Sequence, residues 1–179
     1  MRGREFMTAL AVLVGVTAGG FVAAGSASAD DFRADTFRLM NAATDQCADL
    51  PVKPVTGREV VQEPCTGTPT SVWLAESVPN TLYFRLVNQS TGICVDAVGG
   101  GAPVVQADCS PKLLSQQWQF VFGPVGGPVA QSVRVVNRAL GQCLEVKDGS
   151  LAEGAPLQVS PCADSVAQQK WLKIDVLRP

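Results

Sequence analysis

The sequence predicts an all-β fold built from three copies of one unit arranged around a pseudo-threefold axis. In each copy a cysteine follows an asparagine by six residues, a second cysteine follows 18, 15 or 19 residues later, and a tryptophan lies eight or nine residues beyond. Repetition of this kind indicates a repeat architecture. The landmarks are Asn41, Cys47, Cys65 and Trp73, then Asn88, Cys94, Cys109 and Trp118, then Asn137, Cys143, Cys162 and Trp171.

The segments between the landmarks have the composition of short β-strands. They are rich in Val, Leu, Ile and aromatic residues, and clusters of Gly, Pro and Asn separate them. Such runs bounded by turn residues favour strands, whereas helical periodicity is weak outside the N-terminus. Four strands per copy predict twelve strands in all. The clearest of them span residues 81–88, 104–106, 133–137, 143–146 and 171–176.

The first 29 residues resemble a secretory leader. Arg2 and Arg4 precede an apolar run at residues 7–22, and Ala27-Ser28-Ala29 fits a cleavage site. Glycines interrupt the apolar run, which is shorter than the ~20 residues of a spanning helix, so a leader is favoured over an anchor. We therefore expect a secreted, extracellular protein. Its predicted organisation is a signal peptide at 1–29 and one domain at 30–179, with repeats at about 37–80, 81–128 and 129–179.

The charge of the predicted mature chain argues against two classes of partner. Without Arg2, Arg4 and Glu5, the 14 basic residues become 12 and the 16 acidic residues become 15, a net charge of −3. Nucleic-acid and anionic membrane surfaces select basic stripes, so we expect neither as a partner. About 150 residues suit a single domain with its own core, and we expect a monomer.

The six cysteines of an exported chain are expected to form disulfides. Six cysteines allow 15 pairings, and the repeat selects the one that stays within each copy. Zinc is the competing use of cysteine, but the chain has no C-x-x-C pair and no histidine. We expect no metal and no cofactor. The predicted pairs are Cys47 with Cys65, Cys94 with Cys109, and Cys143 with Cys162.

The residue inventory also argues against an enzyme. The absence of histidine removes Ser-His-Asp and Cys-His arrangements. A glycosidase needs two carboxylates that face one bond, and no pair stands out from the repeats. We therefore predict a protein without catalytic residues.

A motif around the tryptophans connects the repeats to a known family. Gln116-Gln117-Trp118 and Gln169-Lys170-Trp171 match Q-x-W, while Ser71-Val72-Trp73 keeps only the tryptophan. In phase with the cysteine pairs, this motif resembles the ricin B-chain type β-trefoil lectin domain, also called a family 13 carbohydrate-binding module. The resemblance covers nearly all of the mature chain. It implies that the tryptophans fill the core and that each Q-x-W glutamine hydrogen-bonds within its repeat.

The same resemblance implies a shallow sugar site in each repeat. An acidic side chain two residues after the first cysteine accepts hydrogen bonds from sugar hydroxyls, a ring stacks on the sugar, and amides complete the contacts. Charge-assisted hydrogen bonds of this kind are short and strong. Carried over by position, the acidic residues are Asp49, Asp96 and Glu145, and the amides are Gln106, Gln158 and Gln116, with Gln62 as the first-copy equivalent of Gln106.

This chain departs from the family pattern at the stacking ring. Glu63, Ala107 and Ser160 stand where the aromatic residue is expected, and Glu145 replaces the usual Asp. Asp96 is the leading site candidate, whereas hydrogen bonding to their own loops is the simpler interpretation of the other two acidic residues.

Two functions follow from this pattern. The first is a secreted carbohydrate-binding module whose weak sites act together through avidity. The alternative is a degenerate trefoil that serves protein interaction or scaffolding.

Overall fold

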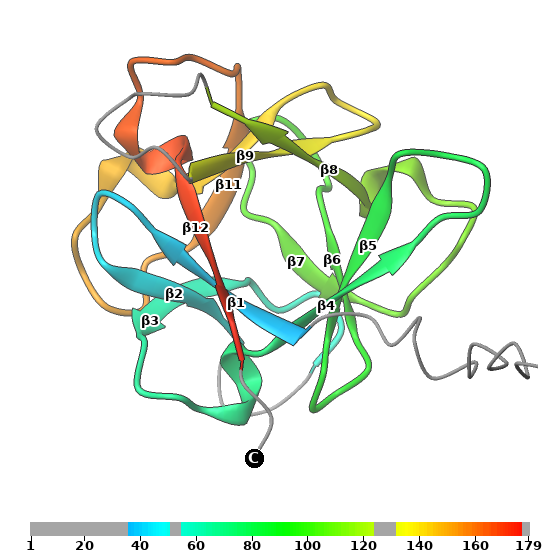
Figure 1. Cartoon of the computed structure of the whole chain (residues 1–179), viewed down its shortest axis with the longest axis horizontal. Helices are drawn as coiled ribbons and strands as arrows, with labels where there is room; N and C mark the ends of the chain where they lie inside the picture. The colour runs from blue at the N-terminus through cyan, green and yellow to red at the C-terminus, as the bar shows by residue number, and fades with distance from the viewer. Residues whose placement is uncertain (1–35, 51–54, 124–131, 177–179) are drawn as a thin grey trace, which may run out of the picture. The chain divides into compact units, whose positions relative to one another are not determined.

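A computed structural model describes residues 36–50, 55–123 and 132–176, and the predicted leader at 1–29 lies outside these ranges. The described residues form a β-trefoil of twelve strands (Figure 1), which confirms the predicted fold class. Six strands form the barrel: β1 Thr36–Asn41, β4 Trp73–Ser77, β5 Phe84–Asn88, β8 Gln117–Phe122, β9 Ser132–Asn137 and β12 Trp171–Asp175. Six form hairpins: β2 Gln46–Asp49, β3 Val61–Pro64, β6 Cys94–Asp96, β7 Val105–Ala107, β10 Cys143–Val146 and β11 Leu157–Ser160.

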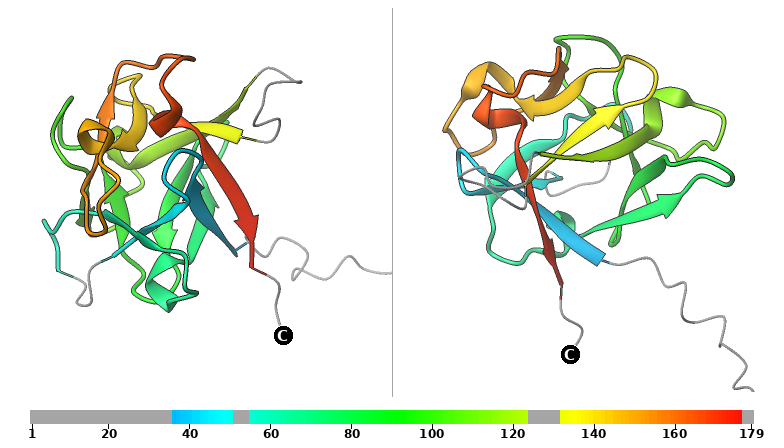
Figure 2. Two further views of the ribbon diagram at one scale, coloured as in Figure 1. Left: turned by 90° about the vertical axis from the view of Figure 1, so that its left-hand side faces the viewer. Right: turned by 45° about the horizontal axis from the view of Figure 1, so that its top comes forward.

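The barrel closes because each of its strands pairs antiparallel with two others. The order runs β1, β4, β5, β8, β9, β12 and back to β1. The pairs β2–β3, β6–β7 and β10–β11 are the hairpins, and these strands gather at one end of the barrel (Figure 2). Closure leaves no free edge within the barrel.

Short 3₁₀ turns complete each repeat. η2 Pro69–Ser71, η3 Leu114–Gln116 and η5 Ala167–Gln169 each precede a landmark tryptophan, and η4 Lys147–Gly149 follows β10. Among the described residues no helix has the length and apolarity that a membrane crossing requires.

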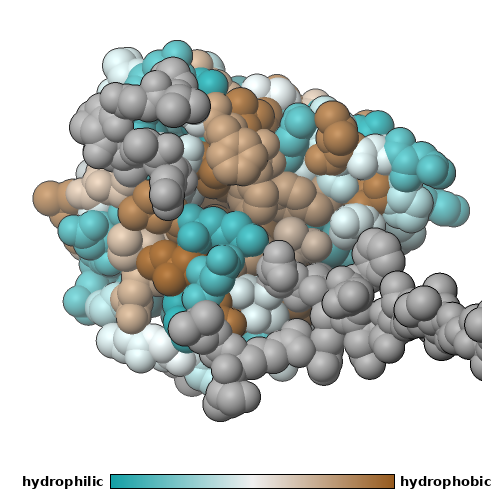
Figure 3. Space-filling model, in the orientation of Figure 1, coloured by the Kyte–Doolittle hydropathy of each residue, from teal (hydrophilic) through white to brown (hydrophobic). Residues whose placement is uncertain are grey.

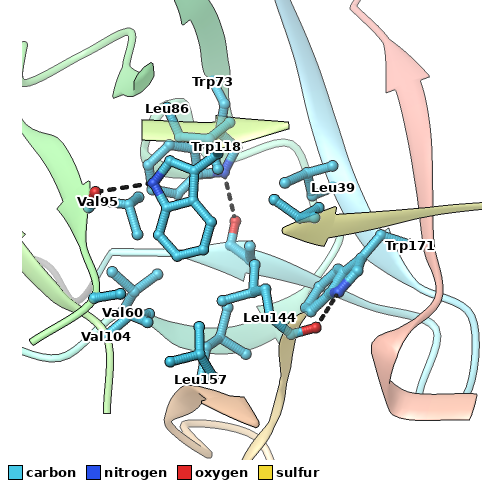
Figure 4. Close-up of a cluster of buried hydrophobic side chains, with 14 of the residues drawn as sticks. Leu39, Val60, Trp73, Leu86, Val95, Val104, Trp118, Leu144, Leu157 and Trp171 are labelled. Carbon is cyan, nitrogen blue, oxygen red and sulfur yellow. Dashed lines mark hydrogen bonds between the residues drawn. The ribbon is translucent and has the colours of Figure 1, made fainter. Parts of the chain in front are cut away.

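The three landmark tryptophans fill the core, as the sequence predicts. Trp73, Trp118 and Trp171 are at most 1% exposed. Each indole Nε1 donates to the carbonyl oxygen of the residue that follows the first cysteine of its own repeat, at 3.0 to 3.2 Å (Figure 4). An indole buried in this way contributes apolar area and keeps its single donor satisfied.

The landmark asparagines join neighbouring repeats. Asn41, Asn88 and Asn137 are fully buried, and each lies opposite a tryptophan of the preceding repeat on the neighbouring barrel strand. Their Nδ2 atoms donate to carbonyl oxygens of the preceding 3₁₀ turn at 2.7 to 2.8 Å, and their Oδ1 atoms accept from the backbone two residues on. Asn88 also begins a glycosylation sequon, but its amide is wholly engaged in this role.

A ring of backbone hydrogen bonds lies on the pseudo-threefold axis. The Val60 N–H donates to Val104, Val104 to Leu157, and Leu157 to Val60, at 2.8 to 2.9 Å. All three residues are at most 1% exposed, and their side chains belong to the buried cluster in Figure 4. Each repeat therefore donates once and accepts once.

The disulfides confirm the predicted pairing. Each bridge lies within one repeat, and its Cα atoms are 5.0 Å apart in all three cases. Closing loops of 15 to 19 residues stabilises the fold by roughly 3 kcal/mol per bridge in the chain-entropy model.

Strand boundaries differ slightly from the prediction. The strand expected at residues 81–88 begins at Phe84, because Asn80 adopts a φ of 59° and the backbone N–H of Thr81 bonds to Val78 in a turn. Val104 lies outside β7 because its N–H donates to the carbonyl of Leu157 in the axial ring.

Two equivalent glutamines, on the second strand of the first and second hairpins, have different surroundings. The Gln62 amide donates to the carbonyls of Ser150 and Ala152 at 3.0 and 2.8 Å and accepts from Thr44 at 2.9 Å, which ties the first repeat to the third. Gln106 is also fully buried, yet neither of its amide atoms has a hydrogen bond among the described residues.

We expect the amide protons of the axial ring to exchange at the rate of global unfolding. Val60, Val104 and Leu157 can release their N–H groups only when the three repeats separate, and such amides exchange slowest. Hydrogen exchange followed by NMR measures this, with the amide of Leu82, a residue 82% exposed, as the fast reference. Exchange in the ring that outpaces the barrel strands would contradict the expectation.

A matched pair of substitutions tests the two glutamines. Gln62→Met removes the buried hydrogen bonds to two carbonyls and a hydroxyl, so we expect the free energy of unfolding to fall by about 1–3 kcal/mol. Gln106→Met removes an unpaired amide, so we expect little change or a gain. Denaturant unfolding of the disulfide-intact variants compares them. Equal losses would show that Gln106 is hydrogen-bonded in solution.

Candidate functional site

The three predicted acidic residues occupy equivalent places on the hairpins. Asp49 and Asp96 end β2 and β6, and Glu145 lies in β10. Their cross-strand partners are Val61, Val105 and Gln158. Asp49 is 3% exposed, Asp96 is 9% exposed and Glu145 is partly buried.

In the third repeat two amides satisfy the carboxylate. Gln158 donates to Oε1 of Glu145 and Gln169 to Oε2, both at 2.8 Å. Gln169 also donates to Oγ of Ser160 at 3.0 Å. Glu145 is therefore fixed in orientation, and a ligand there must share or displace these amide donors.

In the second repeat one amide orients the carboxylate. Gln116 donates to Oδ2 of Asp96 at 3.1 Å and to the carbonyl of Asp108 at 3.0 Å, while its own Oε1 accepts from Ser110. Oδ1 of Asp96 receives no hydrogen bond from the part of the chain that the structure describes. This oxygen is free to accept from a ligand hydroxyl.

Exposed aliphatic residues lie in the two loops that follow Asp96 and precede Gln116. Val98, Leu113 and Leu114 are 63%, 45% and 47% exposed. The loops that carry them meet where the Ala97 N–H donates to the carbonyl of Ser115 at 3.1 Å. These groups offer apolar contact near a position that lacks an aromatic ring.

In the first repeat the carboxylate borders a cavity. Oδ1 of Asp49 accepts from the Leu50 N–H at 2.6 Å, and Oδ2 accepts from Thr68 Oγ1 at 2.7 Å. The adjoining cavity has a volume of about 290 Å³. Its lining consists of Asp49, Leu50, Glu63, Pro64, Thr66, Thr68 and Thr70.

Glu63 is a second carboxyl group in the lining of this cavity. Burial raises the pKa of its carboxyl, and repulsion from Asp49 and then Glu153 raises it further. Two like charges near one site make ionisation of either less favourable. The first repeat therefore concentrates negative charge at its candidate site.

The structure brings some of the predicted amides to the acidic residues and not others. Gln158 and Gln116 contact them directly. Gln106 lies opposite Val95, on the alternate face of its hairpin from Asp96. Successive side chains of a strand point to opposite faces, so Gln106 does not join this site.

Counting from the second cysteine reveals this difference in the sequence. Gln158 lies four residues before its cysteine, whereas Gln106 and Gln62 lie three residues before theirs. An odd shift moves a side chain to the other face of a strand. The sequence pattern did not predict the structural role of the buried asparagines that join the repeats. Their fixed spacing of six residues from the first cysteine is the signal that could have indicated it.

The expected ring positions face the first cysteine of each hairpin. Glu63, Ala107 and Ser160 lie opposite Cys47, Cys94 and Cys143 in register. The single tyrosine, Tyr83, is elsewhere, and the guanidinium of Arg138 lies 4.6 Å from its ring centroid.

Apolar surface also occurs away from the hairpins. The face in Figure 3 carries apolar side chains over β8, β9 and β12. Phe122 at the end of β8 is 75% exposed, and Ile174 in β12 is 37% exposed. Within the described ranges no group of three or more His, Cys, Asp or Glu side chains could hold a metal ion.

Comparison with known proteins agrees with this architecture. The family described as ricin-type β-trefoil lectin domain-like matches residues 25–108 and 114–176. One component of the cytolethal distending toxin of Aggregatibacter actinomycetemcomitans is 28% identical over 102 residues, which cover 55% of this chain and 43% of that protein. The chain thus matches less than half the length of this relative.

Two solved structures are similar in fold. The designed threefold-symmetric protein ThreeFoil has a TM-score of 0.70 at 23% identity, and the match covers 79% of this chain and 99% of that protein. The ricin B-like lectin of Macrolepiota procera, solved in complex with lactose, has a TM-score of 0.66 at 14% identity, and the match covers 79% of this chain and 95% of that lectin. The family match extends across most of the chain, and the protein belongs to the ricin-type β-trefoil lectin domain-like family.

Proposed function

We propose that the protein is a secreted, non-catalytic carbohydrate-binding module that recognises a glycan or polysaccharide through shallow sites in its repeats. The observation that carries this proposal is the oriented carboxyl group at the same point of every hairpin. Asp49, Asp96 and Glu145 are each held by hydrogen bonds from neighbouring groups. A carboxylate fixed in this way accepts hydrogen bonds from adjacent sugar hydroxyls without a further ordering cost.

The second repeat has the simplest chemistry for a neutral sugar. Asp96 has one oxygen held by Gln116 and one available to a ligand. Val98 and Leu114 can contact the C–H face of a pyranose in place of an aromatic ring. Aliphatic contacts are weaker than ring stacking, so we expect low affinity at one site and a gain from presentation of several sites together.

Secretion is supported by the disulfides. Three bridges within the described residues would be reduced in a cytosol and persist in an oxidising compartment. The leader-like composition of residues 1–29 agrees with export.

Protein interaction is the second candidate function. It is favoured by exposed apolar side chains such as Phe122, and by the matched relative, which is named as one component of a toxin. Exposed aromatic side chains are frequent anchors of protein interfaces. On this alternative the barrel face over β8 and β12 contacts another protein chain.

Asp96→Asn tests the glycan proposal. The substitution keeps the shape of the side chain and removes its charge, so we expect affinity for the bound glycan to fall about 10- to 100-fold, the range of a charge-assisted hydrogen bond. A glycan array identifies the ligand and calorimetry measures the affinity. Asp164→Asn, at a side chain 81% exposed, is the matched control. A blank array across plant, microbial and host glycans would reject the proposal.

Phe122→Ser separates the two candidate functions. If the barrel face binds a protein, this variant should lose a co-precipitated partner that simple sugars do not displace. Glycan binding should remain as in the unmodified protein, because Phe122 lies on the barrel strand β8. Leu151→Ser, 70% exposed on a hairpin, is the control. Displacement of the partner by a simple sugar would exclude this interface.

A further inference from the structure

We propose that the cavity of the first repeat binds the protonated amine of an amino sugar, so that this repeat selects glycans with free amino groups. The inference rests on the proposed glycan-binding function and specifies the ligand class of one of its sites. It follows from how the first repeat differs from the third.

Two shorter side chains stand beside Asp49 at the places where the third repeat has amides. In the third repeat, the amides of Gln158 and Gln169 cover both oxygens of Glu145. The first repeat has Val61 and Ser71 at these places. Val61 has no donor, and the Ser71 hydroxyl donates instead to the carbonyl of Thr68 at 2.8 Å. Asp49 is thus left without side-chain amide donors beside about 290 Å³ of free volume.

The carboxylates at this cavity have no ion-pair partner among the described residues. Asp49 accepts hydrogen bonds only from neutral groups, a backbone N–H and a threonine hydroxyl. Glu63 lies two residues beyond Val61, the cross-strand partner of Asp49, and therefore on the same face of the hairpin. No ion pair joins either carboxylate to a Lys or Arg among the residues that the structure describes. Asp49 is the buried one of the two, and buried charges are ordinarily paired.

The surroundings of Glu63 fit a cation better than a neutral ligand. Its Oε1 lies 3.9 Å from the point where a Cβ on Gly154 would stand, which brings it beside the third-repeat loop that carries Glu153. The raised pKa of Glu63, caused by burial, Asp49 and Glu153, agrees with repulsion that a cation would relieve. An ammonium group has three donors and no acceptor, and the polar side chains that line the cavity are two carboxylates and three threonine hydroxyls.

The size and lining of the cavity favour a sugar as the carrier of the amine. About 290 Å³ is near the lower limit of ligand pockets and suits a single ring. Thr66, Thr68 and Thr70 line it with hydroxyl groups that can bond to ring hydroxyls. An N-acetyl group in place of the amine would add bulk and lack the charge, so the acetylated sugar should bind more weakly.

Binding should depend on pH in a defined direction. The charged groups around Glu63 are Asp49 from β2 and Glu153 from the third-repeat loop, and the guanidinium of Arg38 lies beside Gly67 and Ser71. A proton on Glu63 competes with the ammonium ligand. Because the folded protein holds this proton above the ordinary glutamate pKa of about 4.3, its stability falls and its affinity for the amine rises as pH rises through the Glu63 pKa.

The test compares glucosamine oligosaccharides with N-acetylglucosamine oligosaccharides of the same length by NMR titration of the disulfide-intact protein. We expect the free-amine form to shift resonances of the first repeat and to bind at least about tenfold more tightly. Its affinity should increase as the pH rises through the raised Glu63 pKa. Glu63→Gln should reduce this affinity about tenfold and still fold, because it removes a repelled charge. Glu59→Gln, an exposed glutamate in the same repeat, is the matched control.

The outcomes distinguish this inference from the proposed function. Equal binding of both oligosaccharides, or no effect of Glu63→Gln, would reject the amine site and leave Asp96-dependent glycan binding intact. A lysine-containing peptide that binds as tightly as the amino sugar would reject the sugar assignment, since the cavity would then recognise an ammonium group alone. Free-amine binding without any ligand at Asp96 would support the inference and restrict the proposed function to one repeat.

Discussion

The fold depends on the closed ring of three hydrogen bonds among Val60, Val104 and Leu157 on the pseudo-threefold axis. No repeat can form this ring alone, because each supplies one donor and one acceptor to different neighbours. The buried asparagines repeat the same logic at the barrel, where each bonds to the 3₁₀ turn of the preceding repeat. Stability is thus shared among the repeats, whereas each disulfide and each indole bond acts within one.

This division leaves the hairpin edges free to diverge. The backbone holds Asp49, Asp96 and Glu145 at one equivalent position, but the side chains around them differ. Two side-chain amides cover the third carboxylate, one covers the second, and none reaches the first. A ligand can bond only to the carboxylate oxygens that neighbouring side chains do not cover. A single scaffold therefore presents three different surfaces to ligands.

The repeat spacing was enough to predict the architecture because the spaced residues make contacts that the fold requires. A cysteine must reach its partner, and an indole N–H buried in the core must find an acceptor, so both appear at fixed intervals in the chain. The sugar site was less predictable. Gln106 and Gln158 are similar in sequence context, yet one faces the core side of its hairpin and the other faces Glu145. A difference of one residue before the cysteine reverses the face.

The sequence by itself determined the repeat number, the disulfide pairing, the core tryptophans and the absence of stacking rings at Glu63, Ala107 and Ser160. Only the tertiary structure decided which polar groups meet. Asp49 has no side-chain amide donor because Val61 and Ser71, ten residues apart in the chain, occupy the places of Gln158 and Gln169. Glu153 from another repeat raises the pKa of the nearby Glu63. Electrostatic interaction depends on distance in space. Two charges that are far apart in the sequence can therefore interact without any local sequence pattern that predicts it.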